Sequence, residues 1–287
     1  MTSDSGRPQP QSPVRPSPWR PARLWHPAPG PGQQPGQAPA PGWGPLPELL
    51  LALTIVTGLV DAVSILALGR VFVANMTGNV VFAGFAIVGA PGFSLSASLF
   101  ALAGFLAGAG AGGVLATRLG HDRAGHLRAA TAAELLLAAI ALVIAATSGD
   151  PAVSHGTLHL SALRGGATAP AFSTAIADVL ALLLAAAMGI QNAAARKLAV
   201  PDLTTTVLTM TLTGIGADPR TGHRGHLTLI RRVLAVATML GGGILGAWLV
   251  LQVSAVAALA VAVFVLLVTT AGAVAAARAP AAWRAAK

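Results

Sequence analysis

The sequence contains no cysteine and very little charge. Without cysteine in its 287 residues, the chain cannot form disulfides, hold iron–sulfur clusters or use a thiol nucleophile. Charged residues make up only 9% of the chain, whereas hydrophobic residues make up 54% and the mean hydropathy is +0.72. Soluble proteins carry about 25% charged residues, so this chain could not cover a soluble surface with polar groups. The composition therefore predicts an all-α polytopic membrane protein.

Histidine is missing from the apolar runs. All seven histidines are expected in tails or loops, and His155 and His159 show helical spacing but have no carboxylate or cysteine nearby. This arrangement argues against an intramembrane Ser–His protease, a His-ligated haem or a zinc site. We therefore expect no catalytic residues, no metal site and no cofactor, and a protein that is not an enzyme.

The net charge of +9 does not indicate nucleic-acid binding. Nearly all Lys and Arg residues lie in the tails or between apolar runs, which is typical of the cytoplasmic loops of membrane proteins. Residues 1–45 are rich in Pro and Gly and predict a disordered cytoplasmic tail, and residues 278–287 predict a short basic cytoplasmic tail. A transmembrane domain is expected between them, over residues 46–277.

Apolar runs long enough to cross about 30 Å of hydrocarbon indicate six spans. They are expected at 46–68, 95–117, 129–147, 173–196, 232–252 and 255–277. Two further apolar stretches, 71–90 and 203–217, are short or begin with polar residues, so each could be a full span or a re-entrant segment.

Charge counting separates these two topologies. With eight full spans, 12 of the 18 Lys and Arg residues fall on the side of the amino terminus. With six spans and two re-entrant segments, 16 of the 18 fall there, and only Arg70 and Arg164 lie outside. The positive-inside rule favours the second topology, in an inner membrane with both termini in the cytoplasm. Half-helices are then expected over 76–90 and 203–217.

A weak internal repeat supports this topology. Residues 58–62 (GLVDA) match residues 189–193 (GIQNA), and each string precedes a polar re-entrant stretch and then a glycine-rich span. Repeat one covers 46–147 and repeat two covers 173–277. Because each repeat contains three crossings, the second repeat must be inverted relative to the first. Inverted repeats with broken helices that meet near the midplane are a known transporter design.

The same strings resemble a known family. Residues 57–62 (TGLVDA), 74–79 (ANMTGN), 189–193 (GIQNA) and 201–206 (PDLTTT) are similar to the YoaK-like family of uncharacterised bacterial integral membrane proteins. The resemblance covers residues 46–275, and the Pro-rich tail is an addition to the family pattern. It implies a helical inner-membrane protein of about six spans and no established substrate.

Polar residues inside the membrane are the candidate binding residues. A carboxylate such as Asp61 costs about 2.5–3.5 kcal/mol at the centre of a span, so it is expected to face the bundle interior and to have a partner. It could bind a proton, a cation or a substrate, or make a structural hydrogen bond. Pairing with Arg70 needs a bend in the chain, and Arg70 otherwise lies at the outer interface.

The two re-entrant turns supply the other candidates. Asn75, Thr77 and Asn79 are expected at the first turn, and Asp202, Thr204, Thr205 and Thr206 at the second, where Asn and Asp also cap helices. Both half-helix amino termini would point toward the membrane centre with free N–H donors. Gln191 and Asn192 are expected nearer the cytoplasm, as counterparts of Val60 and Asp61. By contrast, Thr131 and Glu134 match a capping box at the start of a span.

These features favour a small-molecule transporter or permease with a polar site at the midplane, which would take a polar or anionic solute. The alternative is a membrane scaffold or regulatory protein that acts through its basic loops and Pro-rich tail. The expected partners are the lipid bilayer and the solute, and association with further copies of the chain is left open.

Overall fold

The structure is a computed structural model, and it describes residues 43–148, 172–200, 203, 205, 208–217, 222–278 and 282–284. Residues 1–42 of the predicted amino-terminal tail, and residues 279–281 and 285–287 of the predicted carboxy-terminal tail, lie outside these ranges. Every regular element within them is helical, which confirms the predicted all-α fold. Six helices are long and apolar enough to cross a membrane: α1 (Leu46–Ala67), α3 (Leu95–Leu119), α4 (Arg123–Thr147), α6 (Thr174–Leu198), α8 (Gly222–Gln252, apolar from Thr228) and α9 (Ala255–Arg278).

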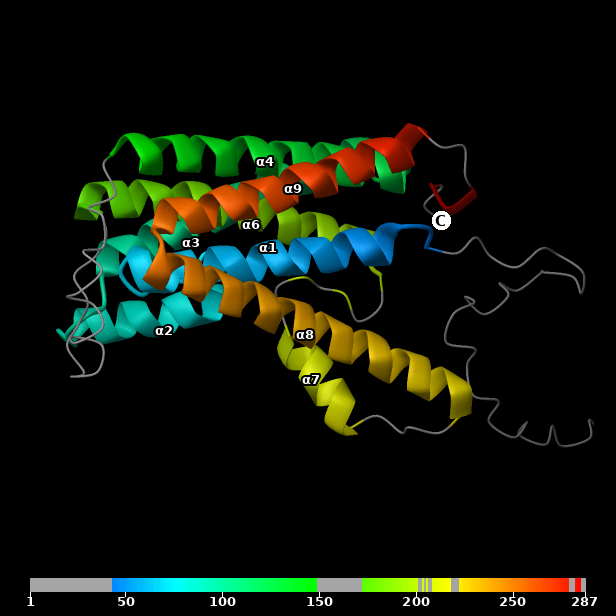
Figure 1. The fold of residues 1–287 in the computed structure, drawn as a ribbon, viewed down its shortest axis with the longest axis horizontal. Coiled ribbons are helices and arrows are strands. Elements are labelled where there is room, and N and C mark those ends of the chain that lie inside the picture. The colour runs from blue at the N-terminus through cyan, green and yellow to red at the C-terminus, as the bar shows by residue number, and fades with distance from the viewer. Residues whose placement is uncertain are drawn as a thin grey trace, which may run out of the picture. The chain divides into compact units, whose positions relative to one another are not determined.

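Two short helices accompany the six long ones. The first, α2 (Met76–Ile87), and the second, α7 (Leu208–Ala217), are only about 18 and 15 Å long, about half the hydrocarbon thickness or slightly more. Figure 1 shows both starting near the middle of the bundle and running outward toward opposite ends. Neither crosses the bundle, so the topology of six spans and two re-entrant half-helices is confirmed. A single 3-10 turn, η1 (Ala282–Arg284), follows α9.

The ends of the long helices separate the basic residues. The starts of α1, α4 and α8 lie at the same end of the bundle as the ends of α3, α6 and α9 (Figure 1), which we call the basic end. Contacts join these segments: the Arg123 guanidinium lies 4.6 Å from the Trp43 ring centroid, and the Arg284 guanidinium bonds to the Asp122 carboxylate at 2.8 Å. Among the residues that the structure describes, Arg70 is the one Lys or Arg at the opposite end. The predicted two-sided charge distribution is thus present in the fold.

Left-handed backbone marks the entry into both re-entrant segments. Arg70 (φ 58°) follows α1 and Ala199 (φ 50°) follows α6, so each reverses the chain just after a span. Thr205 (φ 60°) stands shortly before α7, and left-handed backbone is unusual for a β-branched residue. A helix cannot continue through such a residue, which explains why α7 begins at Leu208 and not at the expected residue 203. The first half-helix likewise ends at Ile87, before Gly89 (φ 76°), and not at residue 90.

The expected start of the third span was wrong. Asp122 is the residue that caps α4, because its carboxylate accepts a hydrogen bond from the Ala124 amide at 3.2 Å. The helix therefore begins at Arg123, and Glu134 lies in its middle rather than in a capping box. His126 is in turn buried within the helix and not in a loop. The cationic residues of the first turns gave this stretch the composition of a loop, although such side chains can extend to the interface from inside a helix.

Each repeat packs its first helix against the glycine-rich helix of the other. A side chain at Gly108 of α3 would collide with the Ala186 carbonyl of α6, and a side chain at Gly242 of α8 would collide with the Ile55 carbonyl of α1. Ile55 and Ala186 each lie three residues before the matched glycines, Gly58 and Gly189. The α3–α6 and α1–α8 contacts are thus equivalent, which supports the inverted repeat and the predicted role of the glycines in close helix approach.

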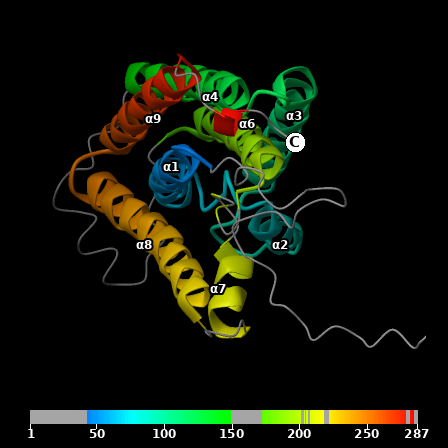
Figure 2. The same cartoon turned by 90° about the vertical axis from the view of Figure 1, so that its right-hand side faces the viewer.

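The centre of the bundle is formed by α1 and α6. In their apolar stretches, 56% and 61% of residues are buried, compared with 22% in α3 and 28% in α8. Figure 2 shows α1 and α6 toward the inside, with α8, α9, α4 and α3 around them. Side chains on α1 and α6 therefore meet inside the protein, while α3 and α8 present most of their residues to the surroundings.

Candidate functional site

The candidate site is centred on a hydrogen bond between the two central helices, α1 and α6. The Gln191 amide of α6 donates to the Thr57 hydroxyl of α1 at 2.8 Å, and both side chains are buried. Thr57 lies about 16 Å along α1 from Leu46, near half the membrane thickness. The bond therefore joins the two repeats at mid-depth. Asp61, one turn beyond Thr57 on the same face of α1, completes what we call the central polar cluster: Thr57, Asp61 and Gln191.

Asp61 faces the chain that leads into the first half-helix. Its carboxylate lies beside the backbone amides of Val73 and Ala74, directly before the α2 cap residue Asn75. The side chain is 9% exposed, and within the described part of the chain its Oδ1 atom has no hydrogen-bond partner. Asp61 is therefore held at the re-entrant turn rather than by Arg70. Arg70 lies instead at the opposite end of the bundle, in a small cavity with Phe72, Phe82 and Phe93.

The central polar cluster has spare acceptor capacity. Besides Asp61 Oδ1, the Oε1 atom of Gln191 is buried without a partner among the described residues, because the Thr57 hydroxyl donates to the Leu53 carbonyl at 3.0 Å. Buried acceptors without partners are costly, and a bound donor would satisfy them. The nearby amino terminus of α2 offers backbone donors. The arrangement suits a small polar solute that carries both donors and acceptors.

The three candidate residues of the first turn have different surroundings. Asn79 is fully buried, and its side-chain amide pairs with the backbone of Phe72, accepting from the Phe72 amide at 2.8 Å. It thereby fixes the loop against α2, and the stacked Phe72 and Phe82 rings, 5.6 Å apart, strengthen the same connection. Asn75 occupies the cap position, but its side chain makes no capping hydrogen bond, and both Asn75 and Thr77 are exposed.

The second turn is described in part. Thr205 is buried, and within the described residues its hydroxyl has no hydrogen-bond partner. Asp202, Thr204 and Thr206 lie outside the described residues. Asn192, the counterpart of Asp61, is half-buried on α6, and its side-chain amide donates to the Met188 carbonyl at 3.0 Å.

Asn192 also lines a cavity of about 830 Å³ between α3 and α6, which Arg196 and Lys197 border at the basic end. We call this cavity the α3–α6 groove.

Two polar groups of this interior escaped the sequence prediction. Thr57 joins α1 to α6, and its position four residues before Asp61 was a usable signal, since such residues share a helix face. Glu134 is 1% exposed in the middle of α4, and neither of its carboxyl oxygens has a hydrogen-bond partner among the described residues. It lies one turn after Thr131, whose carbonyl accepts from the Thr270 hydroxyl of α9. The Thr131–Thr270 contact joins residues that are far apart in sequence, so it could not be recognised without the fold.

Comparison with known proteins connects this fold to a family. Residues 49–272 match the family model described as "Protein of unknown function (DUF1275)". Over 174 residues, the chain is 36% identical to the UPF0700 transmembrane protein YoaK of Bacillus subtilis (strain 168). This alignment covers 59% of this chain and 65% of that protein. The chain thus aligns with slightly less than two thirds of this relative. No solved structure matches. The family match includes both central helices, both half-helices and the central polar cluster, so the chain belongs to the DUF1275 family of uncharacterised, YoaK-like integral membrane proteins.

Proposed function

We propose that this protein transports a small polar solute across the inner membrane, with the central polar cluster as its binding site. The carrying observation is that two buried acceptors, Asp61 Oδ1 and Gln191 Oε1, have no hydrogen-bond partner among the described residues and lie where the two inverted repeats meet, beside a re-entrant turn. Buried polar groups in spans are expensive and commonly mark solute or ion pathways. Broken helices at a repeat interface are the usual place for such a site.

The site supports binding and passage rather than covalent chemistry. Asp61 has no histidine, cysteine or lysine beside it in the structure as described, so it has no visible partner for nucleophilic catalysis. We assign it the role of an acceptor for the solute, with Gln191 as the second acceptor. The basic end would face the cytoplasm, following the positive-inside rule.

Solute flux in reconstituted vesicles tests the proposal. Purified protein would be placed in liposomes and its permeability to urea, glycerol, acetate and an amino acid followed by light scattering. We expect flux of at least one polar solute above that of empty vesicles, and an Asp61→Asn or Gln191→Leu variant should lose at least about 90% of it, since removing a buried hydrogen-bond partner costs about 1–3 kcal/mol.

Glu48→Gln is the matched control, because Glu48 lies exposed in the first turn of the same helix. It should retain the flux of the unmodified chain. Equal flux in Asp61→Asn, Gln191→Leu and Glu48→Gln would contradict the assignment of the site, and the absence of flux for every solute in the panel would contradict transport of this solute class.

A further inference from the structure

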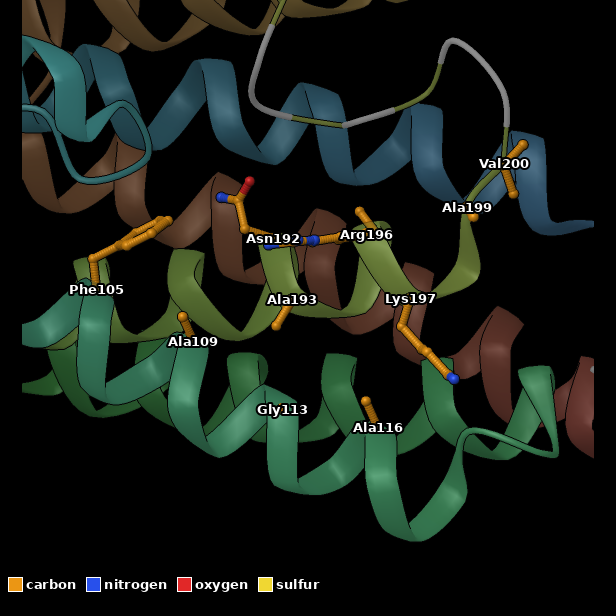
Figure 3. A pocket seen from close by; sticks show the side chains of 11 residues that line it. Phe105, Ala109, Gly113, Ala116, Asn192, Ala193, Arg196, Lys197, Ala199 and Val200 are labelled. Atoms are coloured by element: carbon orange, nitrogen blue, oxygen red, sulfur yellow. The ribbon is translucent and has the colours of Figure 1, made fainter.

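The α3–α6 groove has the dimensions of a binding site for an elongated molecule. Its apolar wall is formed by one face of α3, from Phe105 through Ala109 and Gly113 to Ala116 (Figure 3). This wall is about 16 Å long, close to half of the 30 Å hydrocarbon layer. The volume of about 830 Å³ lies within the usual range of ligand pockets, about 300–1,000 Å³.

Space for an occupant comes from the small residues of the wall. Gly113 is exposed, and a side chain built there would meet no atom within 4 Å, unlike Gly108 and Gly112 on the packed face of α3. The α3 helix therefore uses one row of small residues to contact α6 and another to leave room beside it. The groove runs from about the middle of the membrane to the basic end, which is the path that one acyl chain of a single leaflet would follow.

Two cations from the last turn of α6 border the groove, and Figure 3 shows the Lys197 side chain directed toward α3 and the Arg196 side chain directed along α6 toward Asn192. Arg196 and Lys197 belong to the last turn of α6 and are both exposed, and neither forms an ion pair within the described ranges. The stem of Lys197 lies against Gly120 at the end of α3, so it reaches across the groove from one helix to the other. Two other cations of this end are already engaged: Arg284 pairs with Asp122, and Arg123 lies over Trp43.

We propose that the α3–α6 groove binds one anionic phospholipid of the leaflet at the basic end. Lys197 and Arg196 would both bind the phosphate, with the Arg196 side chain turning from Asn192 toward it, and one acyl chain would follow α3 toward Phe105. Arg and Lys are the usual partners of phosphate groups, and basic pockets between helices on the cytoplasmic side bind lipid headgroups. A net negative headgroup is favoured over a zwitterionic one, since the two cations of the rim have no carboxylate partner in the described part of the chain. The bound lipid would lie beside Ala199, where the chain turns back toward α7.

Lipid binding can be measured without knowledge of any transported solute. Native mass spectrometry of the full chain in detergent would count bound phosphatidylglycerol, and thermal unfolding would give the accompanying shift in Tm. We expect one tightly bound phosphatidylglycerol with a positive Tm shift, and at least tenfold weaker binding of phosphatidylcholine. The double variant Arg196→Gln/Lys197→Gln should lose at least tenfold in affinity for phosphatidylglycerol.

Matched variants separate the groove from the overall charge. Arg118→Gln/Arg128→Gln removes two exposed cations near the basic end that do not line the groove, and it should retain full binding. Gly113→Phe keeps every charge but fills the groove, and it should lose binding as well. The proposal is overturned if the two double variants behave alike, if Gly113→Phe binds normally, or if soluble glycerol phosphate gives the same Tm shift as the lipid. None of these outcomes depends on solute flux.

Discussion

Glu134 places a buried carboxyl group in the middle of the membrane-spanning helix α4. It is buried in α4, a helix that packs against α6 and α9, and within the described chain both of its oxygens lack hydrogen-bond partners. Burying a polar group without compensation costs about 1–3 kcal/mol in proteins, as judged from mutational data. The structure alone therefore gives Glu134 a destabilising effect and no supporting contact.

Replacing Glu134 by Met should raise the stability of the folded chain. Met is similar in size and has no polar group to desolvate, so we expect the free energy of unfolding to increase by about 1–3 kcal/mol. Denaturant unfolding in mixed micelles would measure the change. Glu48→Met, at an exposed position of α1, should change stability far less. A lower stability for Glu134→Met would reveal a polar contact that the fold does not show.

Asp122 makes the attachment of η1 to the start of α4 depend on pH. The hydrogen bond from Arg284 lowers the pKa of the Asp122 carboxyl, and the Gly125 and Ala124 amides act in the same direction. A carboxyl with a lowered pKa contributes fully above the ordinary Asp pKa of about 3.9 and loses its contribution as pH falls through the lower folded value. The contact should therefore be intact at neutral pH and weaken in acid below about pH 4.

Trp283, which lies next to Arg284 in η1, can report this transition. Its fluorescence, taken as the difference between the chain and a Trp283→Phe variant, should change as pH falls below about 4. Asp122→Asn should show the acid signal already at neutral pH and no further titration. A titration that persists in Asp122→Asn would assign the change to another group.

At the scale of the helices, the positions of glycine residues determine which helix pairs can pack closely. Gly108 lies against the α6 backbone, whereas Gly110, two residues further along α3, has no atom within 4 Å of a side chain built there. Gly108→Val should force α3 away from α6 and cost about 1–3 kcal/mol or more, while Gly110→Val should change stability little. Thermal unfolding of the two variants in detergent would measure the difference.

Because the repeats are inverted, the same prediction applies to the equivalent α1–α8 contact. Gly242→Val should weaken the α1–α8 contact as Gly108→Val weakens the α3–α6 contact, because each glycine meets the equivalent carbonyl of the other repeat. If Gly108→Val and Gly110→Val unfold at the same temperature, close approach at Gly108 is not needed for stability.

Helix boundaries show how far the sequence alone could predict this fold. Uninterrupted apolar runs located α1, α3, α6 and α9 to within two residues, because length and hydropathy determine a span. The start of α4 was missed by six residues, since Arg123 and His126 resemble loop residues although they lie within the helix. The start of α7 was missed because Thr205 has a left-handed backbone, which is unusual for a β-branched residue and is not indicated by the local sequence.

In the candidate site too, some features could be predicted from the local sequence and others depend on the fold. Asp61 and Gln191 were predicted, because a carboxylate or amide inside a span is exceptional in itself. Their arrangement was not: the Gln191–Thr57 hydrogen bond joins residues of different repeats, and the Asn79–Phe72 pairing gives Asn79 a backbone contact that its position in the motif did not indicate. The α3–α6 groove also depends on how these two helices pack side by side, which no local pattern records.

At the scale of the whole molecule, the separation of charge sets a testable orientation. The basic end contains the loop between α3 and α4, and the opposite end contains the segment between α2 and α3. Since the chain has no cysteine, single cysteines can be introduced directly at exposed positions such as His121 and Pro91.

Labelling of intact cells with a membrane-impermeant maleimide should modify Pro91→Cys and leave His121→Cys unmodified. Both should react after the membrane is permeabilised. Labelling of His121→Cys in intact cells would reverse the proposed orientation, and equal labelling of both positions before permeabilisation would be incompatible with a bundle that has two distinct ends.

The first helix of each repeat packs against the glycine-rich helix of the other repeat, and this arrangement limits when the bundle can assemble during synthesis. The glycine-rich surface that receives α1 belongs to α8, and more than 150 residues separate the end of one from the start of the other. The α1 helix can therefore complete its packing against α8 only after most of the chain has been synthesised. Membrane insertion and final assembly are consequently separate events for this protein. An insertion chaperone would act in the interval between them, when the surface of α1 that packs against α8 is still uncovered.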